Sequence, residues 1–269
     1  MTTQKNKCDS ILSGIYSNRY SHILTPTNLK HLAREWLKED TPSFDYAGFV
    51  VGEKEETAVL LVKSPGVVAG RPFFDAIFEE LDCKVEWDCE EGEHIENVRT
   101  VAKVTGKVRH LLLGERVALN CLARASGIAT YARKLKRIVE GVEWKGEVAG
   151  TRKTTPGFRM VEKYALLVGG VATHRHDLSS MVMLKDNHIW TAGNVAQAAV
   201  KSAAILKEQF PRLIIEASGG ITESTITKYC DKNVDVISVS KLVQGYDIVD
   251  FSMKITKAGR DPHNPTVHI

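Results

Sequence analysis

The sequence has few cysteines, and they lack the spacing that metal knuckles and small disulfide-bonded domains require. Five cysteines are an odd number, and no two of them form a CxxC pair. Zinc knuckles and disulfide frameworks both depend on such regular pairs. We therefore expect the reducing environment of the cytoplasm.

Long apolar runs are also missing. No segment approaches the roughly 18 apolar residues of a membrane span, and the first twenty residues are polar, without the apolar run of a signal peptide. The 36 basic residues are spread among 33 acidic ones rather than gathered in a tail. We expect a soluble protein that binds neither membranes nor nucleic acid.

What is present is ordinary globular composition with two successive patterns. With 269 residues, 43% of them hydrophobic, the chain can form one large domain or two small ones. Apolar spacing predicts helices over 29–37 and 72–81 and strands over 57–63, 83–89 and 98–104, which is an α+β unit. A helical stretch from 110 to 140 follows, with an expected break at Ser126-Gly127.

Beyond this stretch, short strands alternate with helices. The strands are expected over 146–150, 181–184, 213–216 and 234–239, and the helices over 155–170 and 194–210. This alternation predicts a parallel sheet or barrel, in which functional groups follow the carboxyl ends of the strands. There is no P-loop, GxGxxG motif or internal repeat.

Cations follow three of these strand regions. Arginine binds carboxylates or phosphates through two parallel hydrogen bonds, whereas lysine acts as a point charge, so these residues predict a site for a small anion. The cations are Arg152 and Lys153, then Arg175 beside His174 and His176, then Lys185. Later in the chain, Ser218, Gly219 and Gly220 offer backbone N–H groups for a phosphate, and a following helix would add its positive end.

Two other uses of these residues stay open. His174 and His176 could share one face of a strand and bind a metal with His188 as a third ligand. Lys153 or Lys185 could form a Schiff base if desolvation lowered its pKa, as in a lyase.

Several long motifs together closely resemble the quinolinate phosphoribosyltransferase family, and the resemblance covers nearly the whole chain. They are ERVALNCLARASGIAT (115–130), GTRKTTPGFRMVEKYALLVGG (150–170), HRHDLSSMVMLKDNH (174–188) and EASGGIT (216–222). The segments SPGVVAGRPFFDAIFEEL (64–81), VDVISVSKL (234–242) and DFSMKI (250–255) also resemble that family.

The resemblance implies a fold and a reaction. The fold is an N-terminal α/β sandwich with a linking helix (1–129), an open α/β barrel (130–249) and a C-terminal segment that returns to the first domain (250–269). The reaction joins quinolinate and phosphoribosyl pyrophosphate, with Mg²⁺, into nicotinate mononucleotide, pyrophosphate and carbon dioxide, on the route to NAD. The family assembles as homodimers or hexamers.

The resemblance also implies residue roles. Arg116 would reach into a neighbouring subunit's site, and Arg152, His174 and Arg175 would hold the pyridine carboxylates. Lys153 and Lys185 would be catalytic and contact substrate and pyrophosphate. Ser218, Gly219, Gly220 and Ser240 would receive the phosphate, although the family often has glycine at the position of Ser240.

One departure from the family is large. After Lys-Asp-Asn-His, only 27 residues run from Ile189 to Ile215, about enough for one helix in a βαβ crossover. We therefore expect two barrel strands to be absent, with a seam near Ser202. Those strands would carry the acidic residues beside ribose and Mg²⁺, so we assign no metal ligand. We expect weak or no activity, and the alternative is a noncatalytic isoform or assembly subunit.

Overall fold

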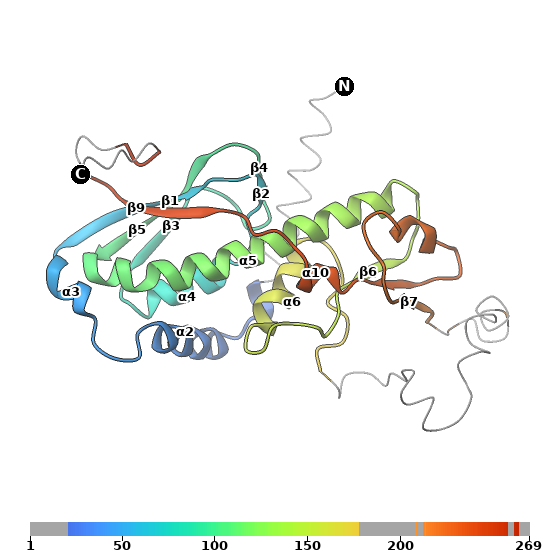
Figure 1. The fold of residues 1–269 in the computed structure, drawn as a ribbon, viewed down its shortest axis with the longest axis horizontal. Helices are drawn as coiled ribbons and strands as arrows, with labels where there is room; N and C mark the ends of the chain where they lie inside the picture. Colours follow the sequence, from blue (N-terminus) through green and yellow to red (C-terminus); the bar gives the residue numbers. More distant parts are fainter. Residues whose placement is uncertain (1–20, 178–207, 209–211, 213, 258–260, 264–269) are drawn as a thin grey trace.

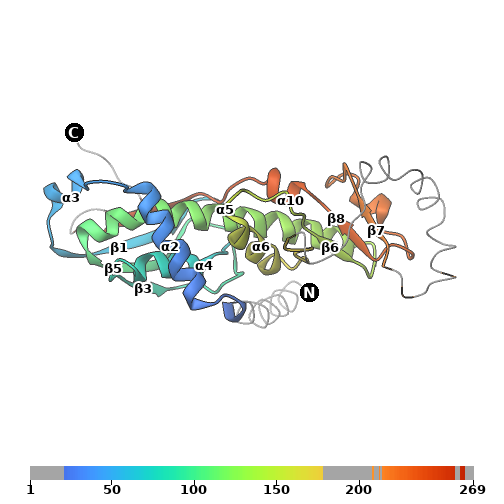
Figure 2. The same ribbon diagram turned by 90° about the horizontal axis from the view of Figure 1, so that it is seen from below.

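The protein is elongated, with an antiparallel sheet at one end, a short parallel sheet at the other and one long helix running between them (Figure 1). This computed structural model describes residues 21–177, 208, 212, 214–257 and 261–263. None of the helices within these ranges is long and apolar enough to cross a membrane. The second view shows the same long axis, with the helix α5 again joining the two ends (Figure 2).

The N-terminal unit is built on a four-stranded antiparallel sheet in the order β3-β5-β1-β9. The predicted α+β unit is thereby confirmed. Its central strand β1 buries five successive residues, Ala58 to Val62, which explains its unbroken apolar sequence. The strands are β1 (Glu55–Val62), β3 (Lys84–Trp87), β5 (Arg99–Lys107) and β9 (Phe251–Ile255), with β2 (Gly66–Val67) and β4 (His94–Ile95) forming a separate pair.

Helices pack around this sheet and contact one another. The amphipathic α4 buries Phe73, Phe74, Ile77 and Phe78, the apolar residues expected of a helix in this segment. The N-terminal helices are η1 (Ser21–Ile23), α2 (Pro26–Asp40), α3 (Tyr46–Val51) and α4 (Arg71–Glu79).

The helix α5 (Val108–Glu140) is continuous over 33 residues, so the expected break at Ser126-Gly127 is wrong. Ser126 and Gly127 instead allow other segments of the chain to pack closely against α5. The Ser126 hydroxyl donates to the Ala69 carbonyl (3.2 Å) and accepts from the Ala69 N–H (3.0 Å). A Cβ at Gly127 would lie 2.3 Å from the Asp247 carbonyl oxygen, so only glycine lets the segment around Asp247 approach.

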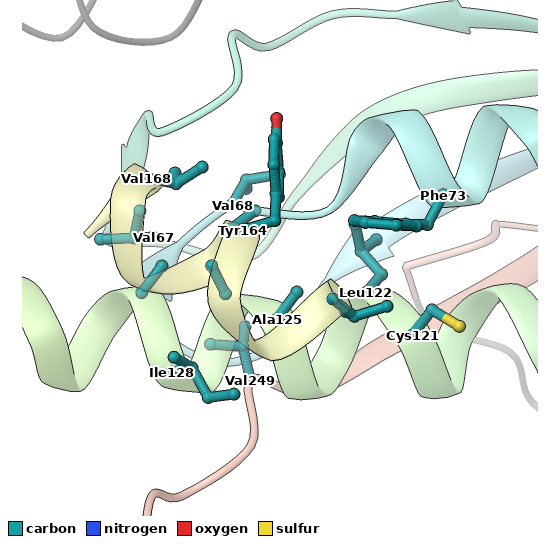
Figure 3. Close-up of a cluster of buried hydrophobic side chains, with 14 of the residues drawn as sticks. Val67, Val68, Phe73, Cys121, Leu122, Ala125, Ile128, Tyr164, Val168 and Val249 are labelled. Atoms are coloured by element: carbon teal, nitrogen blue, oxygen red, sulfur yellow. The ribbon is translucent and has the colours of Figure 1, made fainter. Parts of the chain in front are cut away.

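An apolar cluster joins the two halves of the molecule, with side chains from α4, α5 and α6 packed together (Figure 3). Phe73 of α4 contacts Tyr164 of α6 edge-to-face, with ring centroids 5.5 Å apart. Val67, Val249 and Ile128 extend the same cluster. Because this core is shared, we expect the two halves to unfold together.

The C-terminal unit contains the predicted parallel arrangement. Its sheet has the order β6-β8-β7, and a parallel bridge between Ala149 and Ala172 adds a fourth segment beside β6. Two differences from expectation are larger than one turn or shift a strand: α6 begins at Arg159 after a turn at 156–158, and the third strand covers 216–218 rather than ending at 216. The elements are β6 (Glu147–Ala149), α6 (Arg159–Val168), β7 (Glu216–Ser218), η2 (Ile226–Tyr229), β8 (Val236–Ser238) and α10 (Lys241–Gln244).

Candidate functional site

The parallel register places the loops that carry the predicted site residues at one edge of the sheet. Ala149 and Ser218 both pair with Ser238, and Ala149 also bridges Ala172. Four chain segments therefore leave the sheet at the same level and in the same direction. The structure places seven predicted residues just beyond this carboxyl edge and an eighth, Ser218, at the end of its strand; the seven are Arg152, Lys153, His174, Arg175, Gly219, Gly220 and Ser240.

Lys163, which the sequence analysis did not single out, ties two of these loops together. Its ammonium donates to the carbonyls of Thr151 (2.9 Å) and Arg175 (3.2 Å) and to that of Thr173. The residue is only 4% exposed although it is a lysine of α6. All three N–H groups are thus used to fix the backbone beside Arg152 and His174.

The surroundings of Lys163 disfavour its charge. Burial lowers the pKa of Lys163 to about 8, and the positive charges of Arg159 and Arg152 act in the same direction. Its neighbour Glu162 is buried, accepts a hydrogen bond from the Thr155 N–H (3.1 Å), and has a pKa raised by burial. Lys163, Arg159 and Arg152 are close enough for their positive charges to act on one another, and such a group is suited to an anionic ligand.

His174 is held by a second residue that the sequence analysis did not assign, Glu216 on β7. The His174 Nε2 lies 2.9 Å from the Glu216 Oε2. His174 also has a φ of +59°, in the left-handed region, where a residue other than glycine costs about 1 kcal/mol or more. Such strain is concentrated at functional sites.

Two buried nitrogen atoms near the carboxyl edge have no hydrogen-bond partner among the described residues. They are the Arg152 Nε and the His174 Nδ1. A buried polar atom left unpaired is costly, so each marks a place where a ligand or water completes the structure. Arg152 and His174 are two of the residues predicted to bind an anion.

The Ser218-Gly219-Gly220 turn has the backbone that its sequence predicts. Gly219 and Gly220 have φ values of +104° and +64°, which favour glycine. The Ser218 hydroxyl accepts from that of Ser238 (2.8 Å). No α-helix opens directly after the turn, contrary to expectation, because Thr222 to Thr225 form a separate turn before the 3-10 helix η2. Helix-end charge therefore does not reach Gly220.

Ser240 and Arg116 lie in different surroundings. Ser240 is half-buried and follows β8, directly before the four-residue helix α10. Arg116 is exposed on α5, 16 residues before Ala132, which packs against Gly169. At 1.5 Å per residue this separates Arg116 from Ala132 by about 24 Å along the helix axis, while the next residue, Val117, lines a hollow with Thr155 and Phe158 of the loop after β6.

The two open alternatives receive no support from the described residues. His176 is exposed and the His174 Nε2 is bonded to Glu216, and the described ranges contain no group of three or more metal-ligating side chains. Lys153 is exposed, so it lacks the burial that a Schiff-base lysine requires. The predicted residues Lys185 and His188 lie outside the described residues.

A groove runs beside the carboxyl edge. It has a volume of about 440 Å³, and the exposed side chain of Lys153 forms part of its wall. The groove lies between the loop after β6, the segment around α10 and Arg124 of α5. Its other walls are formed by Arg124, Thr154, Thr155, Pro156, Val243, Gln244, Tyr246 and Ile248.

Lys163 and Glu216 could have been noticed in the sequence. Lys163 stands within the apolar run of α6, where a charge has no place unless it is paired. Glu216 stands on a strand directly before the Ser-Gly-Gly turn. Neither signal identifies the partner, because the contacts join segments 10 to 42 residues apart in the chain.

Comparison with known proteins gives matches across both halves of the chain. The model of the quinolinate phosphoribosyl transferase N-terminal domain matches residues 43–126, and that of the C-terminal domain matches 128–204 and 198–254. The nicotinate-nucleotide pyrophosphorylase [carboxylating] of Rattus norvegicus is 44% identical over 284 residues, covering 89% of this chain and 95% of the relative. The protein of the same name from Homo sapiens is 44% identical over 87% of this chain and 93% of its own.

Solved structures agree with this result. The crystal structure of NadC from Streptococcus pyogenes superposes with a TM-score of 0.75 at 30% identity, covering 86% of this chain and 98% of that one. Its likeness extends over the antiparallel and the parallel parts of the fold. On the matches of both domain models and of these relatives, the chain belongs to the quinolinate phosphoribosyltransferase family.

Proposed function

We propose that this chain converts quinolinate and phosphoribosyl pyrophosphate into nicotinate mononucleotide, pyrophosphate and carbon dioxide, a step toward NAD. The pyridine nitrogen forms a bond to C1 of the ribose as the C1–O bond to pyrophosphate breaks. The neighbouring carboxylate then leaves as carbon dioxide, and the ring carbon takes up a proton. The proposal rests on family membership and on one structural observation, the meeting of four loops at the carboxyl edge.

The cationic loops are proposed to bind quinolinate. Arg152, His174 and Arg175 would hold its two carboxylates, because Arg152 and His174 each have a buried nitrogen without a partner among the described residues. Lys163 would keep these loops in place through its hydrogen bonds to the carbonyls of Thr151 and Arg175. Lys153 and Lys185 are proposed as the catalytic lysines that contact substrate and pyrophosphate.

The opposite side of the edge is proposed to bind the phosphorylated sugar. Ser218, Gly219 and Gly220 would offer backbone N–H groups to the phosphate, with Ser240 beside them on the next loop. The described carboxylate here, Glu216, is bonded to His174, so these residues do not fit a dedicated Mg²⁺ site. We propose that Mg²⁺ enters with the pyrophosphate group, whose oxygens are its usual ligands.

We further propose that the barrel has lost two strands. The two matches to the C-terminal domain model overlap at 198–204, a range that contains the predicted seam at Ser202. The rat alignment supports the same conclusion: 89% of 269 residues is about 239, which leaves about 45 of the 284 aligned positions without a residue in this chain. The lost strands would carry the acidic residues beside ribose.

Assembly and location follow as further proposals. Because Arg116 is exposed, it is proposed to complete the site of a neighbouring copy in a homodimer or hexamer. The described cysteines Cys83, Cys89, Cys121 and Cys230 are free thiols, which supports a reducing compartment such as the cytoplasm.

The proposal is tested by assaying nicotinate mononucleotide formation with the purified chain, beside a variant in which the missing segment is restored from a relative. We expect the chain to bind quinolinate but turn over at least about tenfold more slowly than the restored variant, since ribose and metal contacts are lost. Equal turnover would contradict the loss of functional strands. Quinolinate binding with no product would indicate the noncatalytic alternative, and neither binding nor product would refute the proposed function.

A further inference from the structure

The side chains of His174 and Glu216 are in contact although their backbone segments lie at the two opposite edges of the parallel sheet. The segment containing Ala172 pairs with β6, β6 pairs with β8, and β8 pairs with β7, which carries Glu216. In a flat sheet, three spacings of about 4.8 Å would separate the outer segments by about 14 Å. The 2.9 Å contact between the two side chains therefore links the two outer segments of the sheet.

The pair is shielded from solvent. The side chains of His174 and Glu216 are 7% and 22% exposed. On the histidine ring, Nε2 is engaged by Glu216, while Nδ1 is buried without a partner among the described residues. One nitrogen is thus fixed by the protein, and the other is left for a further group.

A carboxylate hydrogen-bonded to one imidazole nitrogen fixes the tautomer and the orientation of the ring. Because Glu216 accepts from Nε2–H, that nitrogen carries the proton and the ring cannot rotate freely. When the ring is doubly protonated, Nδ1–H can donate to an anion, and the charge of Glu216 balances the imidazolium. The main chain that carries the ring is also fixed, because Lys163 donates to the carbonyl of the preceding residue, Thr173, and His174 has a φ of +59°.

We propose that Glu216 is a positioning residue for substrate binding, which orients His174 so that Nδ1 is presented to a carboxylate of the aromatic dicarboxylate substrate. This inference rests on the proposed function for the identity of that substrate. Glu216 itself does not contact the substrate. It acts through His174, so the loss of either residue should remove the same interaction.

A double-mutant cycle on the full chain tests this role, with quinolinate affinity measured by titration calorimetry. We expect Glu216→Ala and His174→Ala each to weaken quinolinate binding about tenfold, and the double variant to bind no more weakly than His174→Ala alone. Glu216→Gln, whose amide oxygen still accepts from Nε2–H but no longer balances the imidazolium charge, should weaken binding less than Glu216→Ala. His176→Ala, an exposed histidine two residues away, is the matched control and should change nothing.

Nitrogen NMR of the histidine rings supplies a readout that does not depend on substrate. We expect His174 to carry a proton on Nε2 in the parent and in Glu216→Gln, and to lose this fixed state in Glu216→Ala. An unchanged ring in Glu216→Ala, or single effects that multiply in the double variant, would overturn the role of Glu216. A parent chain that does not bind quinolinate would overturn the proposed function and the substrate assignment, whatever the ring state.

Discussion

At the scale of single residues, the buried cation Lys163 connects the loop after β6 to the loop that carries His174. Lys163 satisfies three backbone carbonyls that water cannot reach easily. The cations that would contact an anion are separate residues on the loops it fixes. Binding and positioning are thus divided between neighbouring positive charges, which explains why so many lie in one region.

Replacing Lys163 by methionine keeps the length of the side chain and removes its donors. We expect the free energy of unfolding to fall by about 1 to 3 kcal/mol, because three carbonyl oxygens lose their partner. We also expect KM for quinolinate to rise about tenfold as the loops of Arg152 and His174 loosen. Thermal unfolding and steady-state kinetics measure the two effects.

Lys228→Met is the control for this change, since Lys228 is exposed on η2. It should alter neither the unfolding temperature nor KM. If Lys163→Met behaved like this control, the hydrogen bonds of Lys163 would have no part in organising the site.

At the scale of elements, α5 is the feature that the sequence describes least well. Ser126-Gly127 has the composition of a helix break, but its contacts are with Ala69 and Asp247, which lie far away in the chain. Local propensity cannot reveal such contacts, so a packing site was interpreted as a break. The same limit hid the bond between His174 and Glu216.

Gly127→Ala tests whether α5 needs glycine for packing. Alanine favours a helix over glycine by about 1 kcal/mol, so a free helix would be stabilised. Here the new Cβ would meet the Asp247 backbone at 2.3 Å, and we expect a net loss of about 1 to 3 kcal/mol in chemical denaturation. Asn120→Ala, at an exposed position of the same helix, should be neutral or slightly stabilising. A stabilised Gly127→Ala would contradict the close approach.

The start of α4 predicts a dependence of stability on pH. The buried Glu91 carboxylate accepts from the N–H groups of Gly70 (2.7 Å) and Arg71 (3.1 Å), and burial raises its pKa to about 7. The folded chain then binds this proton more tightly than the unfolded chain. Its contribution to stability is full below pH about 4.5 and is lost as pH rises through about 7.

We therefore expect the unfolding temperature to fall between pH 5 and pH 8, and to fall less in Glu91→Gln. Burial also raises the pKa of Asp75, to about 6, so part of the fall should remain. The difference due to Glu91 should be about 2 kcal/mol. The adjacent exposed Glu90, changed to glutamine, is the control, and an equal slope in all three proteins would refute the role of Glu91.

At the scale of the whole molecule, the sequence predicts both halves of the fold and the cationic part of the site. The position of Arg152, Lys153, His174 and Arg175 after strand regions was enough to group them, because the residues that follow parallel strands lie at one edge of the sheet. It was not enough to find Lys163 or Glu216, which lie within elements and act through distant partners. The position of Lys185 lies outside the described residues, and its role stays a prediction.

The two halves are also joined by the chain's last strand. β9 pairs with β1 of the N-terminal sheet, from Ala58 opposite Ile255 to Val62 opposite Phe251. The chain thus leaves the parallel sheet and returns to the first unit, while α5 and the core around Phe73 and Tyr164 connect the same two parts. Because the two parts are connected in this way, they are expected to unfold together.

The central claim is that the carboxyl edge of the parallel sheet binds an aromatic dicarboxylate. Titration calorimetry of the full chain with quinolinate and with nicotinate, which lacks the second carboxylate, tests it most directly. We predict saturable quinolinate binding that is at least about tenfold tighter than nicotinate binding, because a second charge-assisted contact is available. Equal affinity for the two ligands, or no saturable binding of quinolinate, would contradict the claim.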